Sequence, residues 1–324
     1  MKILITLILA LTLTLTACGG KDIAEPASET VIIQTYNADR ELIDVDVPFD
    51  PQRIAVLDMP ALDILDTLGL GDRIVGSANV SIGYLKQYDP DGSGENIVNL
   101  GTVKTADLEK VALCDPDVIF IGRRLASVYN ELSDIAPVVC LEIDYTTGIV
   151  ESTRENTRMI ASIFGLEDNA DALFADFQSR VDALREVMDG KQVLLGMYNG
   201  NALGLMDSDA QFNIIANELG AVNLGETIGG EDKASHGEEA SWETIIRLDP
   251  EYLFILDRNT AVGAAEESLP GVREVVENDL IRELDVYQDG KIIYIIDHAN
   301  IWYTATGGVQ ALDVMLADLE NALK

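Results

Sequence analysis

Two hydrophobic stretches of the sequence end in arginine. The segment "DPDVIFIGRR" (115–124) ends in Arg123 and Arg124, and "DPEYLFILDR" (249–258) ends in Arg258. Basic residues are scarce in this chain, which has 22 of them against 56 acidic residues. A guanidinium stays charged and donates hydrogen bonds to paired oxygens, so arginines at such points favour an anionic ligand. The alternative is that each arginine is a solvated strand end.

These two stretches belong to a longer match between the halves of the chain. "ADLEKVALCDPDVIFIGR" and "ASWETIIRLDPEYLFILDR" align Glu109 with Glu243, and in both a proline follows the glutamate by seven residues. The match predicts two similar α/β lobes whose strand C-termini surround one cleft. Ligands of open α/β sheets bind outside those strand ends. We therefore expect the arginines to reach one ligand from opposite lobes.

The elements that position these arginines can be read from the hydrophobic pattern. Short apolar runs alternate with amphipathic segments, which indicates parallel strands with crossover helices. Residues 31–48 predict a β-hairpin at the N-terminal end of this pattern. Between residues 150 and 189 apolar residues recur every three or four positions, and this predicts two helices separated by Gly165. The alternation then resumes and ends in a C-terminal helix.

The predicted fold class is α/β, with two lobes of mainly parallel strands joined by a long α-helix. We expect the N-terminal lobe at residues 31–165, the linker helix at 166–189 and the C-terminal lobe at 190–324. A chain of 324 residues, 48% of them hydrophobic, is long enough to build two such cores.

The first 17 residues are typical of an export signal. Lys2 precedes the apolar stretch "ILITLILALTLTL", which is short for a transmembrane span and runs into "LTAC" at Cys18. This pattern resembles a bacterial lipoprotein signal, in which the cysteine is lipidated and becomes the mature N-terminus. An ordinary secretory signal with an incidental cysteine is the alternative. Residues 18–30 are small and polar, and we expect them to form a flexible tether.

Composition excludes several classes of function. The formal net charge of −34 argues against nucleic-acid binding and against attraction to an anionic membrane surface. Cys114 and Cys140 sit in apolar contexts and predict buried free thiols rather than a disulfide. Two histidines in the whole chain make a His-rich zinc site implausible. No phosphate-binding loop or nucleophile motif supports an enzyme, and we expect a monomeric binding protein.

Several segments together resemble a known family. The chain resembles the iron–siderophore-binding lipoproteins of bacterial ABC importers in its lipoprotein-like N-terminus, the two Asp-Pro motifs, the helical linker and the segments "ASHGEEASWE" and "IWYTATGGVQAL". Within that family it is most similar to the members that bind catecholate siderophores of the petrobactin and enterobactin type. The resemblance covers essentially the whole mature chain. It implies a lipid-anchored, extracytoplasmic protein with two rigid lobes and no intrinsic cofactor, which passes a ferric siderophore to a permease. Haem, cobalamin or ferric citrate is the alternative ligand.

The resemblance also implies which residues bind the ligand. Arg123 and Arg258 match two arginines with which the family holds the anionic complex. Gln211 stands where the family has a third arginine, which favours a ligand of lower negative charge or a tetradentate one. Arg124 or Lys233 would compensate for the missing charge.

A histidine and a tyrosine of the family complete the iron shell of a ligand with too few donors, and they match His236 and Tyr303. Ferric iron is a hard cation, so a phenolate with an imidazole is a sensible completing pair. We expect both to touch the metal only with a tetradentate siderophore. The alternatives are an exposed spectator for His236 and a core or cleft-wall position for Tyr303. Trp302 and Trp242 are expected to be packing residues.

Family members dock on their permease through one acidic residue per lobe, on the first helix after the first strand. Asp63 in "PALDILDTLG" and Glu218 in "QFNIIANELG" match these positions. Carboxylates there would meet arginines on the two halves of a permease and orient the cleft over the pore. The alternative is that both are ordinary solvated charges.

Overall fold

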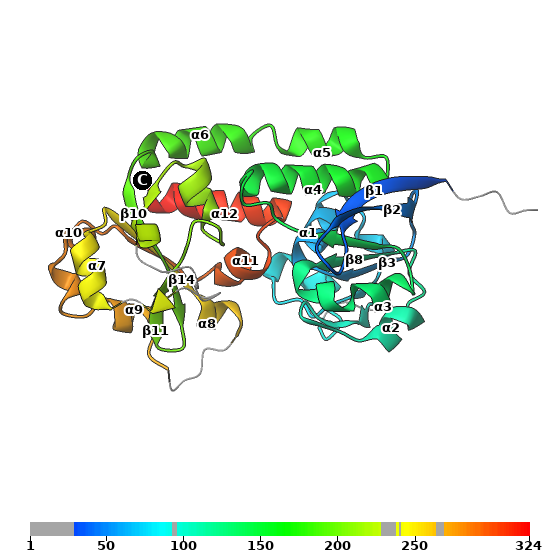
Figure 1. Ribbon diagram of the computed structural model, residues 1–324, viewed down its shortest axis with the longest axis horizontal. Helices are drawn as coiled ribbons and strands as arrows, with labels where there is room; N and C mark the ends of the chain where they lie inside the picture. Colours follow the sequence, from blue (N-terminus) through cyan, green and yellow to red (C-terminus); the bar gives the residue numbers. More distant parts are fainter. Residues whose placement is uncertain (1–28, 93–95, 228–237, 240, 264–268) are drawn as a thin grey trace, which may run out of the picture.

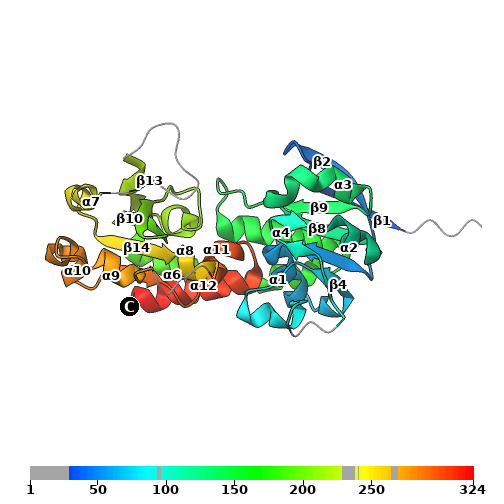
Figure 2. The same ribbon diagram turned by 90° about the horizontal axis from the view of Figure 1, so that it is seen from below.

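The computed structural model describes residues 29–92, 96–227, 238, 239, 241–263 and 269–324. Within these ranges the chain forms two α/β lobes side by side, and a layer of helices lies across both (Figure 1). The view in Figure 2 shows each sheet within its own lobe and the C-terminal helices between them. The predicted fold class is therefore confirmed.

The N-terminal lobe is built on a five-stranded parallel sheet with the order β5-β4-β3-β8-β9. Its central strands are short apolar runs that are almost wholly buried, as parallel strands covered on both faces should be. The strands are β3 (Ile54–Leu57), β4 (Ile74–Ser77), β5 (Val98–Asn99), β8 (Val118–Gly122) and β9 (Val138–Leu141).

The predicted hairpin at residues 31–48 is confirmed. Strands β1 (Thr30–Tyr36) and β2 (Leu42–Pro48) pair antiparallel in a sheet of their own, and β1 lies against β9. The other elements of this lobe are β6 (Gly101–Thr102), β7 (Thr105–Ala106), α1 (Met59–Thr67), α2 (Leu108–Leu113), α3 (Tyr129–Ser133) and the 3-10 turns Gly71–Arg73, Gly83–Tyr88 and Arg123–Val128.

The C-terminal lobe has a mixed sheet with the order β13-β11-β10-β14-β15, and β12 pairs with β10. Strands β10, β12, β14 and β15 are parallel, whereas β11 returns antiparallel beside β10, which the sequence pattern did not predict. The strands are β10 (Gln192–Asn199), β11 (Ala202–Leu205), β12 (Val222–Asn223), β13 (Glu238–Glu239), β14 (Tyr252–Asp257) and β15 (Ile292–Ile295).

Several helices, most of them short, follow the strands of this second sheet. The segment predicted as a helix at "QFNIIANELG" is a single π-helical turn, Ile214–Glu218. The helices are α7 (Trp242–Leu248), α8 (Arg258–Ala261), α9 (Val272–Val276), α10 (Asp285–Gln288), α11 (Ala299–Thr304) and α12 (Val309–Ala322), with 3-10 turns at Leu224–Thr227 and Ile281–Glu283. Helix α12 leaves this lobe and packs against α1 of the other one.

The helical connection between the lobes consists of α4 (Ile149–Ile163), α5 (Glu167–Leu173) and α6 (Phe177–Met188). Gly165 separates α4 from α5 with φ of +66°, as expected for a glycine that ends a helix. The single linker helix expected at residues 166–189 is wrong in detail, because the chain bends between α5 and α6. Phe174 and Phe177 pack edge to face across the bend, with ring centroids 5.5 Å apart, and both are buried.

The repeat predicted from the sequence extends to the backbone. Asp115 and Asp249 precede the two matched prolines, and both adopt the left-handed conformation, with φ of 46° and 47°. The strands that follow, β8 and β14, each lie beside the first strand of their lobe's parallel sheet. The two strand ends that carry the arginines are therefore equivalent positions.

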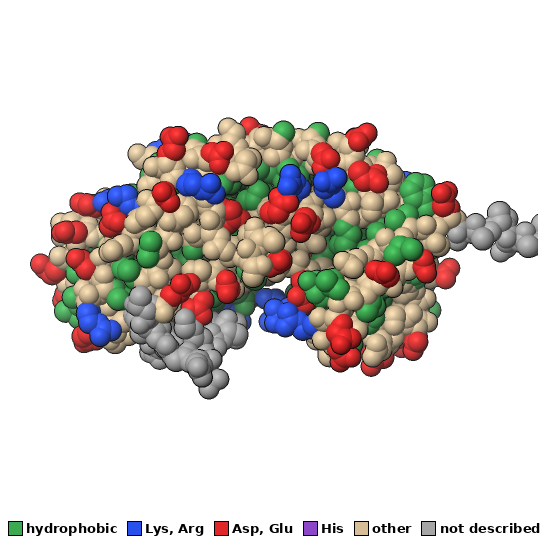
Figure 3. All heavy atoms as spheres, turned by 45° about the horizontal axis from the view of Figure 1, so that its top comes forward, with side chains coloured by type: hydrophobic (Ala, Val, Ile, Leu, Met, Phe, Trp, Pro, Cys, Tyr) green, Lys and Arg blue, Asp and Glu red, His purple; other side chains and the backbone are tan. Residues whose placement is uncertain are grey.

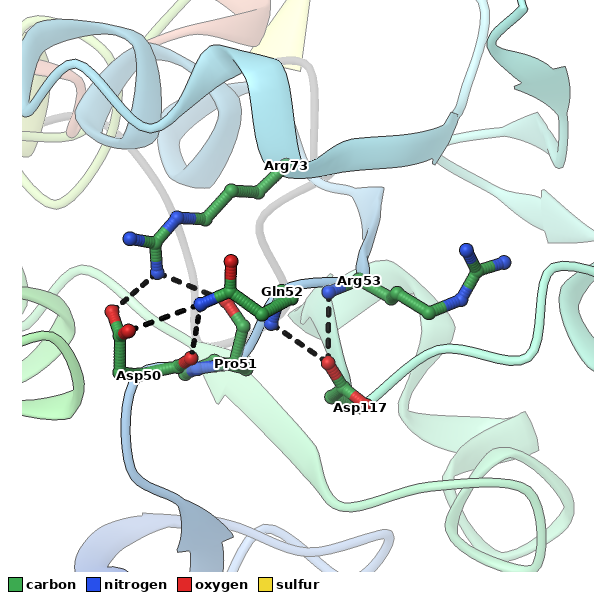
Figure 4. A network of polar contacts seen from close by, with 6 residues as sticks. All are labelled: Asp50, Pro51, Gln52, Arg53, Arg73 and Asp117. Atoms are coloured by element: carbon green, nitrogen blue, oxygen red, sulfur yellow. Dashed lines mark hydrogen bonds and ion pairs between the residues drawn. The ribbon is translucent and has the colours of Figure 1, made fainter.

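An acidic residue after each of these prolines fixes the start of the neighbouring strand. Asp117 accepts hydrogen bonds from the backbone N–H groups of Gln52 and Arg53, at 2.7 and 2.8 Å (Figure 4). In the other lobe Glu251 accepts one from the N–H of Gln192 at 2.9 Å. These contacts hold β3 to β8 and β10 to β14, the strand pairs beneath the cleft.

Residues 1–28, which include the predicted signal, Cys18 and most of the predicted tether, lie outside the described residues. No helix within the described ranges is long and apolar enough to cross a membrane. Cys114 and Cys140 are buried free thiols, as predicted. Burial raises the pKa of Cys140 to about 12 and raises that of Cys114, so neither thiol is readily ionised.

Candidate functional site

A pocket lies between the two lobes at the C-terminal ends of β3 and β8. Its wall contains Asp58, Arg123 and Arg124 from the N-terminal lobe, and Gln211 and Tyr303 from the C-terminal half. Figure 3 shows basic side chains in the notch between the lobes. The cleft predicted at the strand ends is therefore present, and it brings together residues that are far apart in the sequence.

Arg258 lies behind the pocket wall. It is the first residue of α8, directly after β14, and it is half-buried. Its Nε donates to the hydroxyl oxygen of Tyr303 at 3.0 Å, and its Nη1 donates to Oδ1 of Asn199 at 2.8 Å. Two hydrogen bonds hold the guanidinium in one orientation, 5.4 Å from the centroid of the Tyr303 ring.

Arg124 approaches the same tyrosine from the other lobe, with its guanidinium carbon 5.5 Å from the ring centroid. A cation at this distance is attracted to the ring face. The sequence assigned the first-lobe role to Arg123 and treated Arg124 as a substitute. Both line the pocket and both are exposed, but the contact with Tyr303 belongs to Arg124.

Within the part of the chain that the structure describes, the three arginines are not held in ion pairs by the protein. No ion pair there joins Arg123, Arg124 or Arg258 to a carboxylate, although other basic residues are paired. In a chain with 56 acidic residues, this leaves positive charge at the pocket for an anionic ligand.

Sequence reasoning missed Asp58. This residue caps α1, where its Oδ2 accepts from the N–H of Ala61 at 3.1 Å. Burial raises the pKa of Asp58 to about 6, against the opposing effects of the Ala61 hydrogen bond and the positive charge of Arg124. A Cβ at Gly122 would lie 2.2 Å from Asp58 Oδ1, so any larger residue there would displace this carboxylate. An aspartate between a buried strand and Met-Pro is a typical cap signal, and it could have located this side chain.

Tyr303 is 6% exposed and Trp302 is fully buried. Trp302 donates from Nε1 to Asp318 at 2.9 Å and packs against Phe212 with ring centroids 5.6 Å apart. Trp242 is half-buried against the core of the second lobe. The two tryptophans are therefore packing residues, as predicted, whereas Tyr303 is a wall of the pocket.

Two predicted ligand residues, Lys233 and His236, lie outside the described residues. Gln211 lines the pocket, as its place in the resemblance implies. Within the described ranges no group of three or more His, Cys, Asp or Glu side chains could hold a metal ion.

Asp63 does not have the free carboxylate that permease docking requires, and that expectation is wrong. Its side chain has no exposed surface, because α1 turns this face inward. The carboxylate accepts from the Tyr84 hydroxyl at 2.6 Å and from the N–H groups of Gln310 and Ala311 at 2.9 and 3.0 Å. Burial raises its pKa, while these hydrogen bonds lower it.

Glu218 is also turned inward. Its Oε1 accepts from the N–H of Val150 at 2.9 Å, and its Oε2 is buried without a hydrogen-bond partner among the described residues. Burial raises the pKa of this carboxyl group. Neither predicted docking residue therefore presents a free charge at the surface.

Comparison with known proteins supports a binding role. The petrobactin-binding protein YclQ of Bacillus subtilis is 29% identical over 326 residues, which cover 99% of this chain and 98% of the relative. The ferric-anguibactin-binding protein FatB of Vibrio anguillarum is 25% identical over 330 residues, which cover 98% of this chain and 97% of FatB.

Solved structures agree with these relatives. The periplasmic catecholate-siderophore binding protein VctP of Vibrio cholerae matches with a TM-score of 0.77 at 27% identity. The match covers 90% of this chain and 100% of VctP. The crystal structure of YclQ matches with a TM-score of 0.79 at 27% identity, and the match covers 91% of this chain and 99% of YclQ.

A family model described as periplasmic binding protein matches residues 54–299. This range is more than half of the chain, and it contains the parallel strands of both lobes and the three arginines at the pocket. The chain therefore belongs to the periplasmic binding protein family, whose members bind ligands and are not enzymes.

Proposed function

We infer that this protein is the substrate-binding component of an ABC importer and that it carries a ferric siderophore, of the catecholate kind, between its lobes. The observation that carries this proposal is the convergence of Arg124 and Arg258 from opposite lobes on the ring of Tyr303. The relatives described above support it, because they are named for binding petrobactin, ferric anguibactin and catecholate siderophores.

The charges near the pocket favour an anionic complex in spite of the acidic surface. Repulsion from distant carboxylates is screened beyond about 8 Å at physiological salt. An arginine near 4 Å from a ligand oxygen contributes on the order of 4 kcal/mol before desolvation, at an effective dielectric constant of 20. The nearby guanidinium groups therefore outweigh the net charge of −34.

Two features favour a ferric complex of modest negative charge. Gln211 supplies no positive charge to the wall, and Asp58 adds a carboxylate that is ionised above a pH of about 6. A tetradentate siderophore fits this balance and leaves two iron positions open. We propose that Tyr303 and His236 complete the iron shell of such a ligand, since phenolate and imidazole are suitable donors for iron.

We further propose that Cys18 anchors the protein to the membrane and that the bound complex is handed to a permease. The "LTAC" junction after a short apolar run motivates the anchor. Replacement of Cys18 by serine should move the protein from the membrane fraction to the soluble fraction. Unchanged membrane association of Cys18→Ser would remove the anchor from the proposal.

Tryptophan fluorescence provides a direct test of the ligand. In a Trp242→Phe variant the buried Trp302, next to Tyr303, is the only tryptophan. We expect ferric catecholates to quench it with one-to-one stoichiometry and to be recovered unchanged. Haem, cobalamin and ferric citrate serve as competing ligands in parallel titrations. Quenching by one of these three, with none by ferric catecholates, would overturn the assignment.

A further inference from the structure

Two long helices begin without a capping side chain of their own. Helix α4 starts after Gly148 and helix α12 starts after Gly308, and neither glycine has a side chain that could accept a hydrogen bond from the first turn. The first N–H groups of a helix need acceptors outside it. In both helices a carboxylate from a distant part of the chain supplies them.

Asp63 caps α12 from the N-terminal lobe. The carboxylate lies on α1 and accepts from the N–H groups of Gln310 and Ala311, in the first turn of α12. Any Cβ at Gly308 would lie 2.5 Å from the Asp63 carboxylate, so the glycine permits this close approach. The helix itself follows the elements of the C-terminal lobe in the chain.

Glu218 caps α4 in the opposite direction. The carboxylate lies at the end of the π-helical turn of the C-terminal lobe and accepts from the N–H of Val150, in the first turn of α4. Gly148 has φ of +95°, and a Cβ there would lie 2.7 Å from Glu218 Oε1. Helix α4 follows β9, the edge strand of the N-terminal lobe.

The same turn also holds the segment that leads into α4. Asn213 and Asn217 donate from their side chains to the carbonyl oxygen of Tyr145, at 3.1 and 2.8 Å. Tyr145 lines the ligand pocket. The Glu218 cap therefore belongs to a set of contacts from the C-terminal lobe that reaches the pocket wall on the other side.

The other helices with a side-chain cap are capped locally. Within the described chain these are α1, α2, α7 and α8, where Asp58, Asp107, Ser241 and Asp257 each bond to an N–H three residues later. A local cap stabilises one helix. Caps at α4 and α12 instead join the lobes, and α4 and α12 lie side by side across the boundary (Figure 1).

We propose that Asp63 and Glu218 are positioning residues that set the angle between the lobes, each by capping a helix that comes from the opposite lobe. The two caps act in opposite directions between the lobes, so together they resist both opening and twisting. The separation of Arg124 from Arg258 across the pocket depends on that angle. This proposal does not depend on which ligand the pocket takes.

The test is the distribution of distances between the lobes, measured by pulsed electron paramagnetic resonance without ligand. Spin labels are placed at Glu131→Cys and Leu280→Cys, which are exposed and lie in different lobes, with Cys18 replaced by serine. Native Cys114 and Cys140 are buried and should stay unlabelled. We expect Glu218→Ala and Asp63→Asn to broaden the distribution, because each removes an acceptor from a capped turn.

Two further variants make the result specific. Asp107→Ala removes a local cap of α2 and should lower stability without changing the distances. Glu218→Gln keeps an acceptor oxygen for Val150 and should restore the wild-type distribution. Hydrogen exchange at Val150 and Gln310 reports whether each cap is lost. Fast exchange at these amides with an unchanged distribution, or equal broadening in Asp107→Ala, would overturn the proposal.

Discussion

The two lobes carry arginine at equivalent strand ends but hold it differently. Arg123 and Arg124 follow β8, are exposed and make no side-chain hydrogen bond among the described residues. Arg258 follows β14, is half-buried and donates to Tyr303 and Asn199. The first lobe thus offers adaptable charges, and the second offers a fixed one.

This difference assigns separate tasks to the two halves of the pocket. A group that is already held in its binding orientation loses little side-chain entropy when the ligand arrives. Arg258 should therefore supply most of the affinity, together with the ring of Tyr303 that it orients. The exposed arginines can follow ligands of different shape, so they should contribute more to the association rate than to the affinity.

Removal of the fixed arginine should have the largest effect. Arg258→Ala should weaken binding of a ferric catecholate by about 1.5–3 kcal/mol, the usual contribution of a hydrogen bond to a charged group. Isothermal titration calorimetry measures this loss. Arg247, an exposed arginine on α7, provides the matched control, and Arg247→Ala should bind like the wild type.

The adaptable arginines should matter less at equilibrium. Arg123→Ala and Arg124→Ala should each weaken ligand binding by about 0.5–1 kcal/mol, which is the range measured for exposed charge pairs. This loss of affinity should become smaller as salt is added. Stopped-flow binding at low and high salt would detect the slower association. If either variant lost as much affinity as Arg258→Ala, the contrast between the lobes would be wrong.

Tyr303→Phe separates the role of the ring from that of the hydroxyl. The ring faces that attract Arg124 and Arg258 remain in this variant. Arg258 loses the hydroxyl that accepts its hydrogen bond, and we expect ligand binding to weaken by about 1 kcal/mol. With a tetradentate ferric catecholate we expect a shift of the charge-transfer band, and with a hexadentate one no shift. Identical spectra of wild type and Tyr303→Phe with the tetradentate ligand would show that the phenol does not bind iron.

Much of this comparison could be predicted from the sequence, because it depends on local pattern. Buried apolar runs, the Asp-Pro motif and the strand-end arginines are short-range features, and a repeat places them at equivalent points. The pocket therefore contains Arg123, Gln211 and Tyr303 as expected. The stacking of Arg124 on Tyr303 depends on how the lobes meet, which no local pattern specifies.

The sequence also failed to predict the inward orientation of Asp63, because that orientation depends on contacts between distant parts of the chain. Its partners on α12 are 247 and 248 residues away in the chain. A carboxylate in a helix is normally solvated, so the sequence favoured a surface role. The apolar residues on both sides, Leu62 and Ile64, are fully buried and gave the only local hint that this face turns inward.

A pH-dependent effect is expected from Asp58, the one described carboxylate in the pocket with a pKa near 6. Its pKa is raised by burial, so the folded protein binds this proton more tightly than the unfolded chain does. The contribution of Asp58 to the free energy of unfolding should therefore increase as the pH falls through about 6 toward the ordinary value of 3.8, and it should be absent above that window. Asp58→Asn keeps a capping oxygen for α1 but cannot titrate. The difference in unfolding free energy between wild type and Asp58→Asn, measured by urea unfolding from pH 7.5 to 4.5, isolates this residue from all other acids.

Protonation of Asp58 also removes a negative charge near Arg124, so affinity for an anionic ferric complex should rise as the pH falls through the same window. At pH 7 Asp58→Asn should bind more tightly than the wild type by about 1 kcal/mol, the scale of a charge interaction at intermediate dielectric. Because the siderophore itself titrates, the two proteins must be compared at each pH with the same ligand. The gap between them should close toward pH 5, where Asp58 is mostly neutral. A gap that stays constant from pH 7.5 to 5 would show that Asp58 does not change its charge in the pocket.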